Sequence, residues 1–267
     1  MKIIVLIKQV PEMERVKFDT TRGVINRKSA GVEINPFDLN ALEAALQIKE
    51  EFAAEVIALS MGPTRAEGVI KEAIARGADD GILLTDRKFS GADTRATAYL
   101  LASAIDKIGN VDLVIAGEMT VDGDTAQVGP QTAEYLGLAH IAYVTKLEEI
   151  TEDYLTVVAP TWDGNYSKKI NYPGLITVTK DLNTPRLPLL KRKLEVREAE
   201  VEKWGIADFE TELDPQDVGL KGSCTRVRKI EVPSPVEREG KMWTGDQLRE
   251  AITEVAQICQ EKDRMGE

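Results

Sequence analysis

The sequence predicts an α/β fold built on a doubly wound, mostly parallel sheet of the Rossmann type. Through the first 140 residues, short β-branched segments alternate with amphipathic ones, which is typical of βαβ units. A chain of 267 residues with 43% hydrophobic content can bury a substantial core. After residue 182 the chain becomes charged and irregular. We therefore expect an α/β core over residues 1–225 and a C-terminal arm over residues 226–267.

The strands of the parallel sheet are predicted where β-branched runs lie between polar or glycine-containing turns. These runs are Ile3–Ile7, Val56–Ser60, Gly81–Leu84 and Val111–Ala116. The segments between them carry apolar residues at helical spacing, so each presents one apolar stripe to a sheet. The predicted helices are Phe37–Phe52, Arg65–Arg76 and Thr94–Ile108. Asn35 and Pro36 are a good start for the first helix, as a cap and a proline at the first helical position.

The pattern changes after residue 140, where four β-prone runs are joined by turn-like sequences. The runs are Tyr143–Ile150, Leu155–Thr161, Tyr166–Ile170 and Leu175–Thr179. Their short connections predict an antiparallel extension of the sheet. A final helix is expected from about Thr244 to Lys262. Because such a tail rarely folds alone, we expect the arm to pack on another subunit; the alternative is a helix folded back on its own domain.

Charge and composition argue against several classes of protein. A formal net charge of −11 disfavours nucleic-acid binding, which needs a basic face. No apolar run is long enough for a membrane span and no signal peptide is visible, so a cytoplasmic location is expected. Cys224 and Cys259 lie far apart, which favours structural thiols over a disulfide or a metal site. The single histidine, His140, has no partners for proton transfer nearby, so no catalytic residues are predicted.

The most informative segment is the loop Glu118–Gln131, which follows the apolar run 111–117 and leads into the helix-like 132–137. At such a junction in a parallel sheet, free backbone N–H groups and the positive end of the helix dipole point to one place, and diphosphates bind there. The loop is neither a Walker loop nor a GxGxxG sequence. The residues alone therefore predict a nucleotide site without specifying its chemistry.

Each residue type in this loop has an expected role. Asp122 and Asp124 are anions and cannot bind phosphate, so we expect Asp122 to accept backbone N–H groups and Asp124 to form a capping box with Gln127. The groups expected near the phosphates are the backbone at Gly123 and Gly129, the hydroxyls of Thr125 and Thr132, and the Gln127 carboxamide. Pro130 leaves the helix start open, since a start at Asp124 would bend the helix and a start at Gly129 would place Pro130 first. The alternative is a solvated acidic loop.

The sequence Asp122-Gly-Asp-Thr-Ala-Gln-Val-Gly129 closely resembles the nucleotide loop of electron transfer flavoprotein beta subunits. Further segments occur in the family's order and spacing, and together they cover most of residues 1–200. They are Val5–Pro11, Asn35–Asp38, Ser60–Pro63, Gly91–Thr97 and Asp181–Arg186. The resemblance implies an adenine-nucleotide alpha-hydrolase-like fold. It also implies a bound nucleotide, which is AMP in one branch of the family and FAD in another.

The resemblance also implies which residues surround the nucleotide. The implied loop contacts are Val121, Asp122, Gly123, Asp124, Thr125, Ala126, Gln127, Val128, Gly129 and Thr132. The implied walls around the adenosine are Leu6, Lys8, Asn35, Asp38 and Met61. These residues stand at the ends of neighbouring predicted strands, where an open α/β sheet binds its ligands. The alternatives are a solvated charge for Lys8 and plain core positions for Leu6 and Met61.

The segment Gly91-Ala-Asp-Thr-Arg-Ala-Thr97 separates the branches, because subunits that resemble the flavin-bifurcating type carry it together with the loop sequence above. Asp93 can cap a helix that starts at Thr94, Gly91 permits close approach, and the Thr94 and Thr97 hydroxyls would help to cradle a diphosphate. FAD is therefore favoured over AMP. The alternative is an ordinary capped helix start.

In the bifurcating branch, the beta-bound FAD takes two electrons from NADH. One electron goes to ferredoxin or flavodoxin, and the other goes through a flavin of the alpha subunit to a dehydrogenase such as an acyl-CoA dehydrogenase. The resemblance thus implies a heterodimer with an alpha subunit. Two alternatives remain: an AMP-carrying subunit of a simple electron shuttle, and a stand-alone nucleotide-binding protein without a redox role.

The family's recognition loop aligns with residues 183–197 of this chain. The resemblance implies partner docking through Leu187, Leu189 and Leu190, with Leu190 at the anchoring position. The lysine-rich run that often follows is interrupted here as Arg192-Lys-Leu-Glu-Val-Arg-Glu198, which leaves the identity of the partner open. The alternative is that these leucines cover the sheet below.

Overall fold

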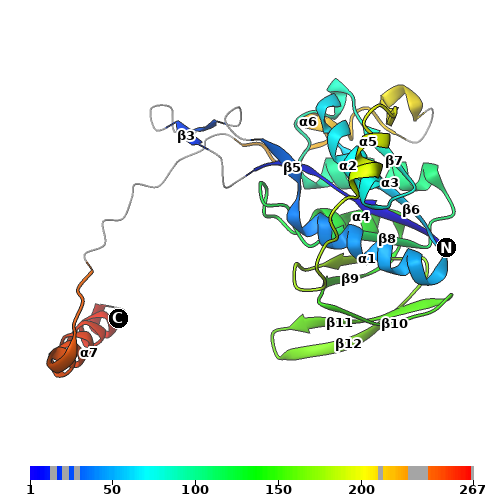
Figure 1. The fold of residues 1–267 in the computed structure, drawn as a ribbon. Coiled ribbons are helices and arrows are strands. Elements are labelled where there is room, and N and C mark those ends of the chain that lie inside the picture. The colour runs from blue at the N-terminus through cyan, green and yellow to red at the C-terminus, as the bar shows by residue number, and fades with distance from the viewer. Residues whose placement is uncertain (13–16, 20–23, 27–30, 210–212, 228–239, 266–267) are drawn as a thin grey trace. The chain divides into compact units, whose positions relative to one another are not determined.

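The computed structural model describes residues 1–12, 17–19, 24–26, 31–209, 213–227 and 240–265. The chain divides into two units, Met1–Ile230 and Glu231–Glu267. The first unit contains the sheets and their covering helices (Figure 1). The second contains a 3-10 turn, η5 (Gly245–Gln247), and the helix α7 (Leu248–Met265), close to the helix expected from the sequence.

A seven-stranded sheet forms the centre of the first unit, and every strand pair in it is parallel. Its strands, in spatial order, are β14 (Glu202–Trp204), β7 (Asp80–Leu84), β6 (Glu55–Met61), β1 (Lys2–Leu6), β8 (Leu113–Gly117), β13 (Gly174–Val178) and β9 (Ala139–Val144). The central strand β1 is buried on both faces, as parallel strands covered by helices are. The predicted α/β class is confirmed.

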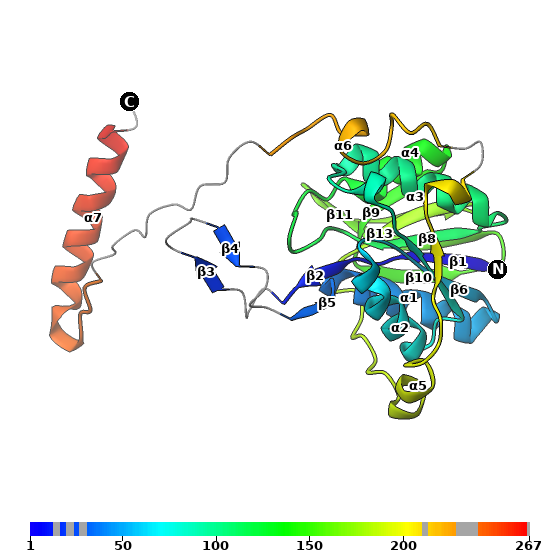
Figure 2. The same ribbon diagram turned by 90° about the horizontal axis from the view of Figure 1, so that it is seen from above.

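Helices cover both faces of this sheet (Figure 2). The helices α1 (Pro36–Phe52) and α2 (Glu67–Arg76) pack on one face, and α3 (Thr94–Ile108) and α4 (Val128–Leu136) pack on the other. Alternation along β1 divides the core in the same way, because Ile3 and Val5 join the first cluster and Ile4 and Leu6 the second. The three helices predicted before residue 110 begin within two residues of their expected starts.

The strand order reverses beside β1. From β1 the chain builds outward through β6 and β7, and it then returns to place β8 on the opposite side of β1. The connection after β1 leads to α1 on one face, whereas the connection after β8 leads to α4 on the other. A crevice between diverging connections is expected at the carboxyl ends of β1 and β8, and such crevices hold ligands in open α/β sheets.

The predicted antiparallel extension is partly wrong. The run expected at Leu175–Thr179 is β13, which lies inside the parallel sheet between β8 and β9, and all five of its residues are buried. The run expected at Tyr143–Ile150 is two strands, β9 and β10 (Lys146–Ile150), because Tyr143 takes a positive φ of 60° and the chain turns out of the main sheet.

The remaining antiparallel strands form a separate sheet of β10, β11 (Tyr154–Thr161) and β12 (Gly164–Asn171). Alternate residues of β11 point inward and are buried, namely Leu155, Val157 and Ala159. This sheet therefore belongs to the same core as α1. The chain enters it from β9 and leaves it to β13.

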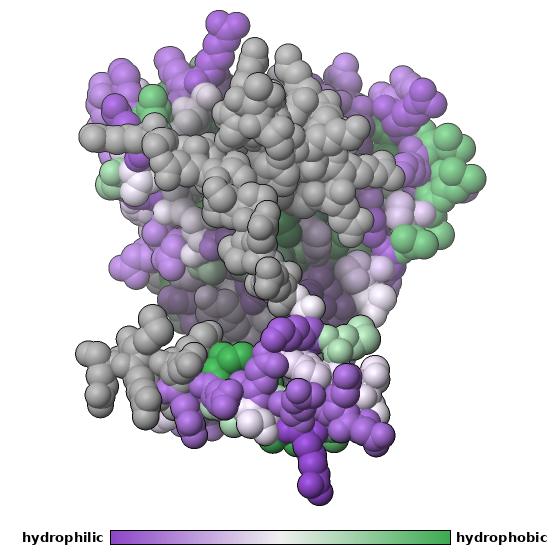
Figure 3. Space-filling model, turned by 90° about the vertical axis from the view of Figure 1, so that its left-hand side faces the viewer, coloured by the Kyte–Doolittle hydropathy of each residue, from purple (hydrophilic) through white to green (hydrophobic). Residues whose placement is uncertain are grey.

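The other elements are short. They are the paired strands β2 (Gln9–Pro11) and β5 (Val32–Ile34), the paired strands β3 (Lys17–Asp19) and β4 (Val24–Asn26), the 3-10 turns η2 (Thr64–Ala66), η3 (Arg87–Phe89) and η4 (Ile206–Asp208), and the helices α5 (Leu190–Glu195) and α6 (Gly219–Gly222). The coloured surface in Figure 3 is mostly hydrophilic, with smaller apolar areas. Within the described ranges, none of the helices has the length and apolar character needed to cross a bilayer.

Candidate nucleotide site

An ion pair joins the two strands that flank the reversal of strand order. Lys8, just after β1, places its Nζ 2.7 Å from Asp122 Oδ1 in the loop after β8. The same ammonium lies 3.5 Å from Thr120 Oγ1. Burial alone would raise the pKa of Asp122, but the hydrogen bonds and charge of Lys8 outweigh it and lower that pKa. Lys8 is therefore not a solvated, unpaired charge. We expected the Asp122 carboxylate to accept backbone N–H groups across Gly123, but the structure pairs it with Lys8.

Asn35 fixes the loop after β8 from the other side. Its Nδ2 donates to the Met119 carbonyl at 2.8 Å, and its Oδ1 accepts the Val121 N–H at 3.1 Å. Asn35 precedes α1 as predicted, but its side chain makes no capping hydrogen bond because both of its polar ends are used on the loop. It is completely buried. The buried side chain of Asn35 therefore holds the loop after β8 in place and is not part of the surface of the site.

Asp38 is a buried carboxylate beneath the same place. Its Oδ2 accepts the backbone N–H of Lys8 at 2.8 Å. Burial raises the pKa of Asp38 to about 7, despite the opposing hydrogen bonds from Asn35, Lys8 and Gly117. Like Asn35, this residue acts on the loop and strand end, and its side chain is not exposed to a ligand.

The backbone of the loop is open toward a ligand. The N–H groups of Gly123 and Asp124 both donate to the Thr120 carbonyl, whereas those of Thr125, Ala126 and Gln127 find no acceptor among the described residues. Asp124 and Ala126 have positive φ values of 51° and 53°. Alternation of left- and right-handed residues turns successive N–H groups into a concave anion-binding nest. This is the geometry that the sequence alone leads one to expect at a diphosphate.

The predicted capping box is wrong. The helix α4 begins at Val128 with Gln127 as the preceding residue, and no side chain caps it. The cause is the left-handed conformation of Asp124 and Ala126, which keeps residues 124–127 out of the helix. The helix start therefore lies near the later of the two alternatives, and Pro130 falls in the first turn, where a missing N–H does no harm.

Gly129 and Thr132, both in α4, serve the structure of the chain itself. A Cβ added to Gly129 would lie 2.5 Å from Thr177 Cγ2 of β13, so glycine is required there for α4 to approach the sheet. A Cβ on Gly123 would meet only the Thr120 hydroxyl, at 3.3 Å. The Thr132 hydroxyl, expected as a phosphate donor, is buried and donates to the Val128 carbonyl at 2.7 Å. The Thr132 hydroxyl is therefore engaged within α4 and does not reach the surface.

The start of α3 is capped as predicted, since Asp93 Oδ1 accepts the Ala96 N–H at 3.1 Å. Asp93 also receives partners that the sequence did not reveal. Its N–H donates to Ser223 Oγ at 2.8 Å, and its Oδ2 accepts both the N–H and the hydroxyl of Thr225. Burial alone would raise the pKa of Asp93, but the hydrogen bonds that its carboxylate accepts from Ala96 and Thr225 outweigh burial and lower that pKa. Asp93 is thus a structural residue, while Thr94 and Thr97 have hydroxyls without acceptors among the described residues.

The segment that reaches Asp93 comprises residues 217–225. Arg95 holds it by pairing with Asp217 at 2.8 Å and donating to the Gly222 carbonyl at 2.8 Å. A Cβ on Gly219 would lie 1.9 Å from the Lys88 carbonyl, and the φ of Gly219 is 58°. The available sequence signal was the pair of glycines, 219 and 222, inside a charged and otherwise irregular region.

The remaining predicted residues lie along the carboxyl edge of the sheet. Leu6 is a buried core residue, whereas Met61 is partly exposed at the end of β6. The loops that start α3 and α4 follow β7 and β8, with β6 and β1 between them. Four adjacent strands span roughly 14 Å at the usual spacing. The two helices also pack on each other through Tyr99 and Tyr135, whose ring centroids are 5.5 Å apart.

The predicted docking leucines are exposed. The exposed fractions are 83% for Leu187, 67% for Leu189 and 73% for Leu190. The alternative that they cover the sheet is therefore wrong. Both cysteines are free and exposed, so they are not buried structural thiols. His140 lies on the edge strand β9 and is exposed.

Comparison with known proteins decides the family. The model of the electron transfer flavoprotein domain matches residues 22–208. The chain belongs to this family. It is 44% identical over 252 residues to the electron transfer flavoprotein subunit beta of Thermoanaerobacterium thermosaccharolyticum, covering 94% of this chain and 95% of the relative.

Two further relatives of this electron transfer flavoprotein carry other names. The subunit CarD of the caffeyl-CoA reductase-Etf complex of Acetobacterium woodii is 39% identical over 264 residues, which are 98% of this chain and 99% of CarD. Protein FixA of Sinorhizobium fredii is 40% identical over 262 residues, which are 96% of this chain and 91% of FixA. At these coverages both matches include residues 118–131 and 183–197.

Proposed function

We propose that this electron transfer flavoprotein beta subunit binds FAD at the carboxyl edge of the sheet and pairs with an alpha subunit in a flavin-bifurcating heterodimer. The observation that carries the proposal is that two helices begin at the same edge of the sheet and both offer hydrogen-bond donors there that are unpaired among the described residues. These donors are the N–H groups of the nest before α4 and the two unused hydroxyls at the start of α3. A mononucleotide needs only the first of them.

The residues of the site fit an adenine dinucleotide. The free N–H groups of residues 125–127 suit a diphosphate, and Lys8 adds a cation at the same strand end. Met61 offers a partly exposed apolar surface to the adenosine half. Thr94 and Thr97 would then donate to the half that extends toward α3. Asn35 and Asp38 hold this arrangement from beneath.

The flavin, when bound, would accept hydride from NADH and release single electrons. The chain itself contributes binding, orientation and a local charge balance. One electron would go to ferredoxin or flavodoxin, and the other would pass through the alpha-subunit flavin to a dehydrogenase such as an acyl-CoA dehydrogenase.

The recognition loop would dock that dehydrogenase. Leu187, Leu189 and Leu190 form an exposed apolar group next to Lys191 and Arg192. An apolar group with a basic rim fits a hydrophobic pocket edged with carboxylates on the partner. In the same way, the terminal helix α7 exposes Leu248, Ile252 and Val255 at helical spacing, which suits the alpha subunit as the covering surface.

A second candidate function is that of a simple electron shuttle whose beta subunit carries AMP. It is favoured by the nest alone, because a single nucleotide would fill it. The third candidate, a stand-alone nucleotide-binding protein, would leave the exposed apolar residues of the recognition loop and α7 without use. Family membership and these surfaces favour a heterodimer.

Nucleotide content tests the proposal. The chain should be produced together with its alpha subunit, and the nucleotides released from the purified complex should be counted. Two FAD per heterodimer, with one reduced by NADH, would support bifurcation-type binding. One FAD and one AMP would support the simple shuttle, and a colourless monomer would support the third candidate.

A pair of hydroxyl substitutions sharpens this test. Replacing Thr94 and Thr97 together by valine should lower FAD content at the beta site without changing the alpha flavin, because valine keeps the shape and removes the donors. Ser103→Ala is the matched control, since the Ser103 hydroxyl lies on the same helix and donates to the Tyr99 carbonyl. An unchanged beta-site content in the threonine variant would mean that the ligand stops at the first helix start.

A further inference from the structure

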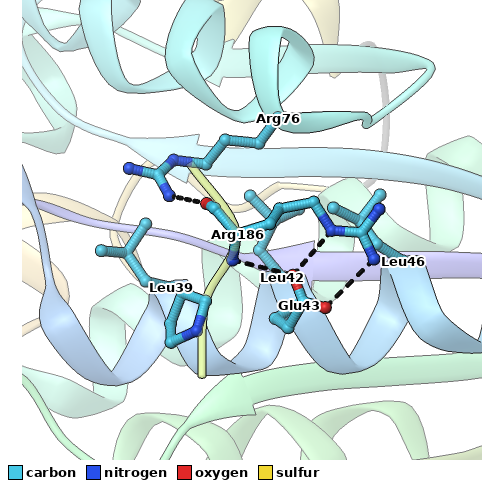
Figure 4. A pocket seen from close by; sticks show the side chains of 7 residues that line it. Leu39, Leu42, Glu43, Leu46, Arg76 and Arg186 are labelled. Carbon is cyan, nitrogen blue, oxygen red and sulfur yellow. Dashed lines mark hydrogen bonds and ion pairs between the residues drawn. The ribbon is translucent and has the colours of Figure 1, made fainter. Parts of the chain in front are cut away.

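The residues just before the docking leucines are fixed to α1 by one arginine. Arg186 Nε lies 2.8 Å from Glu43 Oε2, and Arg186 Nη2 lies 3.0 Å from Glu43 Oε1. The backbone N–H of Arg186 donates to the same carboxylate at 3.1 Å. Figure 4 shows the guanidinium and the backbone of Arg186 converging on Glu43 beside Leu42 and Leu46 of α1. Three hydrogen bonds thus end on one carboxylate.

The carboxylate that receives them is buried. The side chain of Glu43 is 7% exposed, and burial alone would raise its pKa. The hydrogen bonds and charge of Arg186 outweigh burial and lower the pKa of Glu43. Removing Arg186 alone would cost much, because Glu43 would be left as a buried and uncompensated charge. The position of Arg186 is therefore strongly determined.

Further hydrogen bonds hold the backbone of the same segment. The Arg76 guanidinium of α2 donates to the Arg186 carbonyl, and Arg76 is itself paired with Glu72 at 2.7 Å. Three residues earlier, the amides of Asn183 and Asn40 bond reciprocally to each other's backbone carbonyl at 3.0 and 2.8 Å. The segment 183–186 is thus attached to two helices, whereas the side chain of the residue that follows it, Leu187, is largely exposed.

We propose that Arg186 is a positioning residue for partner docking: its clamp on Glu43 fixes the backbone from which Leu187, Leu189 and Leu190 project. This inference rests on the proposed docking function of the recognition loop. Exposed apolar residues on a fixed backbone bind with less loss of conformational entropy than the same residues on a mobile one. The short helix α5 starts four residues after Arg186, at Leu190.

The test compares docking with loop order in the purified heterodimer. The variant Arg186→Gln/Glu43→Gln removes both charges, so no buried carboxylate is left unpaired. With NADH as the electron donor, ferredoxin as one acceptor, and an acyl-CoA dehydrogenase with its enoyl-CoA substrate as the other, the half-saturating concentration of dehydrogenase should rise about fivefold or more. The maximal rate and the flavin content should stay unchanged, and amide hydrogen exchange over residues 187–195 should become faster.

Three comparisons make the result specific. Lys49→Gln breaks another ion pair of α1, with Asp79 at 2.5 Å, and should leave docking unchanged. Arg186→Lys keeps the charge but not the forked geometry, and should restore docking only in part. In a Leu190→Ala background, the double substitution should add little further loss, since Arg186 acts through the leucines.

The outcomes separate this inference from the function on which it rests. If Leu190→Ala weakens docking but the Arg186→Gln/Glu43→Gln variant does not, the positioning role is wrong. A full additional loss in the Leu190→Ala background also overturns it, because Arg186 would then contact the partner directly. If Leu190→Ala itself has no effect on docking, the proposed docking surface is wrong, and unchanged hydrogen exchange would dismiss the clamp independently.

Discussion

Lys8 and Asp122 form an ion pair of 2.7 Å between the end of β1 and the loop after β8, across the point where the strand order reverses. Both side chains are partly exposed. Such pairs contribute only about 0–1 kcal/mol to stability. Their value here is positional, because the pair fixes the entrance of a loop whose following N–H groups are free.

The first prediction concerns this pair. Asp122→Asn should lower nucleotide content at the beta site several-fold, because the loop loses its ion pair with Lys8 and keeps only uncharged hydrogen bonds to it, while the unfolding temperature changes little. Lys71→Gln, which breaks the Lys71–Glu67 pair on α2, is the control and should retain full content. Normal nucleotide content in Asp122→Asn would show that Asn35 alone holds the loop.

The second prediction is a pH dependence caused by Asp38. Its pKa is about 7 in the folded chain and 3.8 without burial, so the folded state binds the proton more tightly. The contribution to stability is complete below pH 3.8 and is lost as the pH rises toward 7, with a slope of at most about 1.4 kcal/mol per pH unit. Unfolding temperatures measured from pH 5 to 8 should therefore fall more steeply for the native chain than for Asp38→Asn. Identical slopes would mean that Asp38 stays charged.

Glu118 must be controlled for in that experiment. Its pKa is also raised, by burial and by the negative charge of Asp181, so it gives a slope of the same sign. Glu118→Gln alone should flatten part of the profile, and Asp38→Asn should flatten it further in that background.

The third prediction separates the two glycines of the nucleotide loop. Gly129→Ala should destabilise the chain by about 1–3 kcal/mol, because its methyl group would overlap Thr177 Cγ2. Gly123→Ala should be nearly neutral. Thr177→Ser removes the methyl group but keeps the hydroxyl that accepts the Tyr143 N–H, so it should rescue Gly129→Ala. Failure of the rescue would place the cause in the helix start and not in the packing.

The fourth prediction tests the recognition loop. Leu190→Ala should weaken transfer to the dehydrogenase by roughly tenfold or more, since a factor of ten corresponds to ~1.4 kcal/mol of binding free energy. Flavin content and reactivity with NADH should be unchanged, because the Leu190 side chain is exposed and lies outside the nucleotide loop. Val32→Ala, at another exposed aliphatic residue, is the control. Loss of thermal stability with normal docking would mean that Leu190 serves packing.

The fifth prediction concerns the terminal helix. Leu248, Ile252, Val255 and Ile258 recur along α7 and are all exposed. Adding the alpha subunit should therefore raise the unfolding temperature of the chain, since a partner that binds only the folded state stabilises it. Ile252→Ser should weaken the heterodimer without altering the unfolding of the chain alone. An unfolding temperature that does not respond to the alpha subunit would contradict this.

The sequence predicted the parallel core well, because the spacing of apolar residues that distinguishes strands from helices can be read within a short stretch of sequence. The same patterns misplaced Leu175–Thr179, since a short apolar run reads alike in either kind of sheet. The Arg186–Glu43 clamp joins residues 143 positions apart and had no local signal. The prediction of a capping box was wrong for a different reason. Asp124 and Ala126 take positive φ values, and the composition of the loop did not indicate them.

The three-stranded sheet between β9 and β13 has a consequence for how this family can vary. Parallel neighbours require the chain to return from the carboxyl edge to the amino edge of the main sheet, a task usually done by a helix. Here β10, β11 and β12 do it, and an odd number of antiparallel strands ends opposite to where it began. Insertions in this region are thus constrained by parity: a whole hairpin can be gained or lost while the core keeps its register, whereas a single strand cannot.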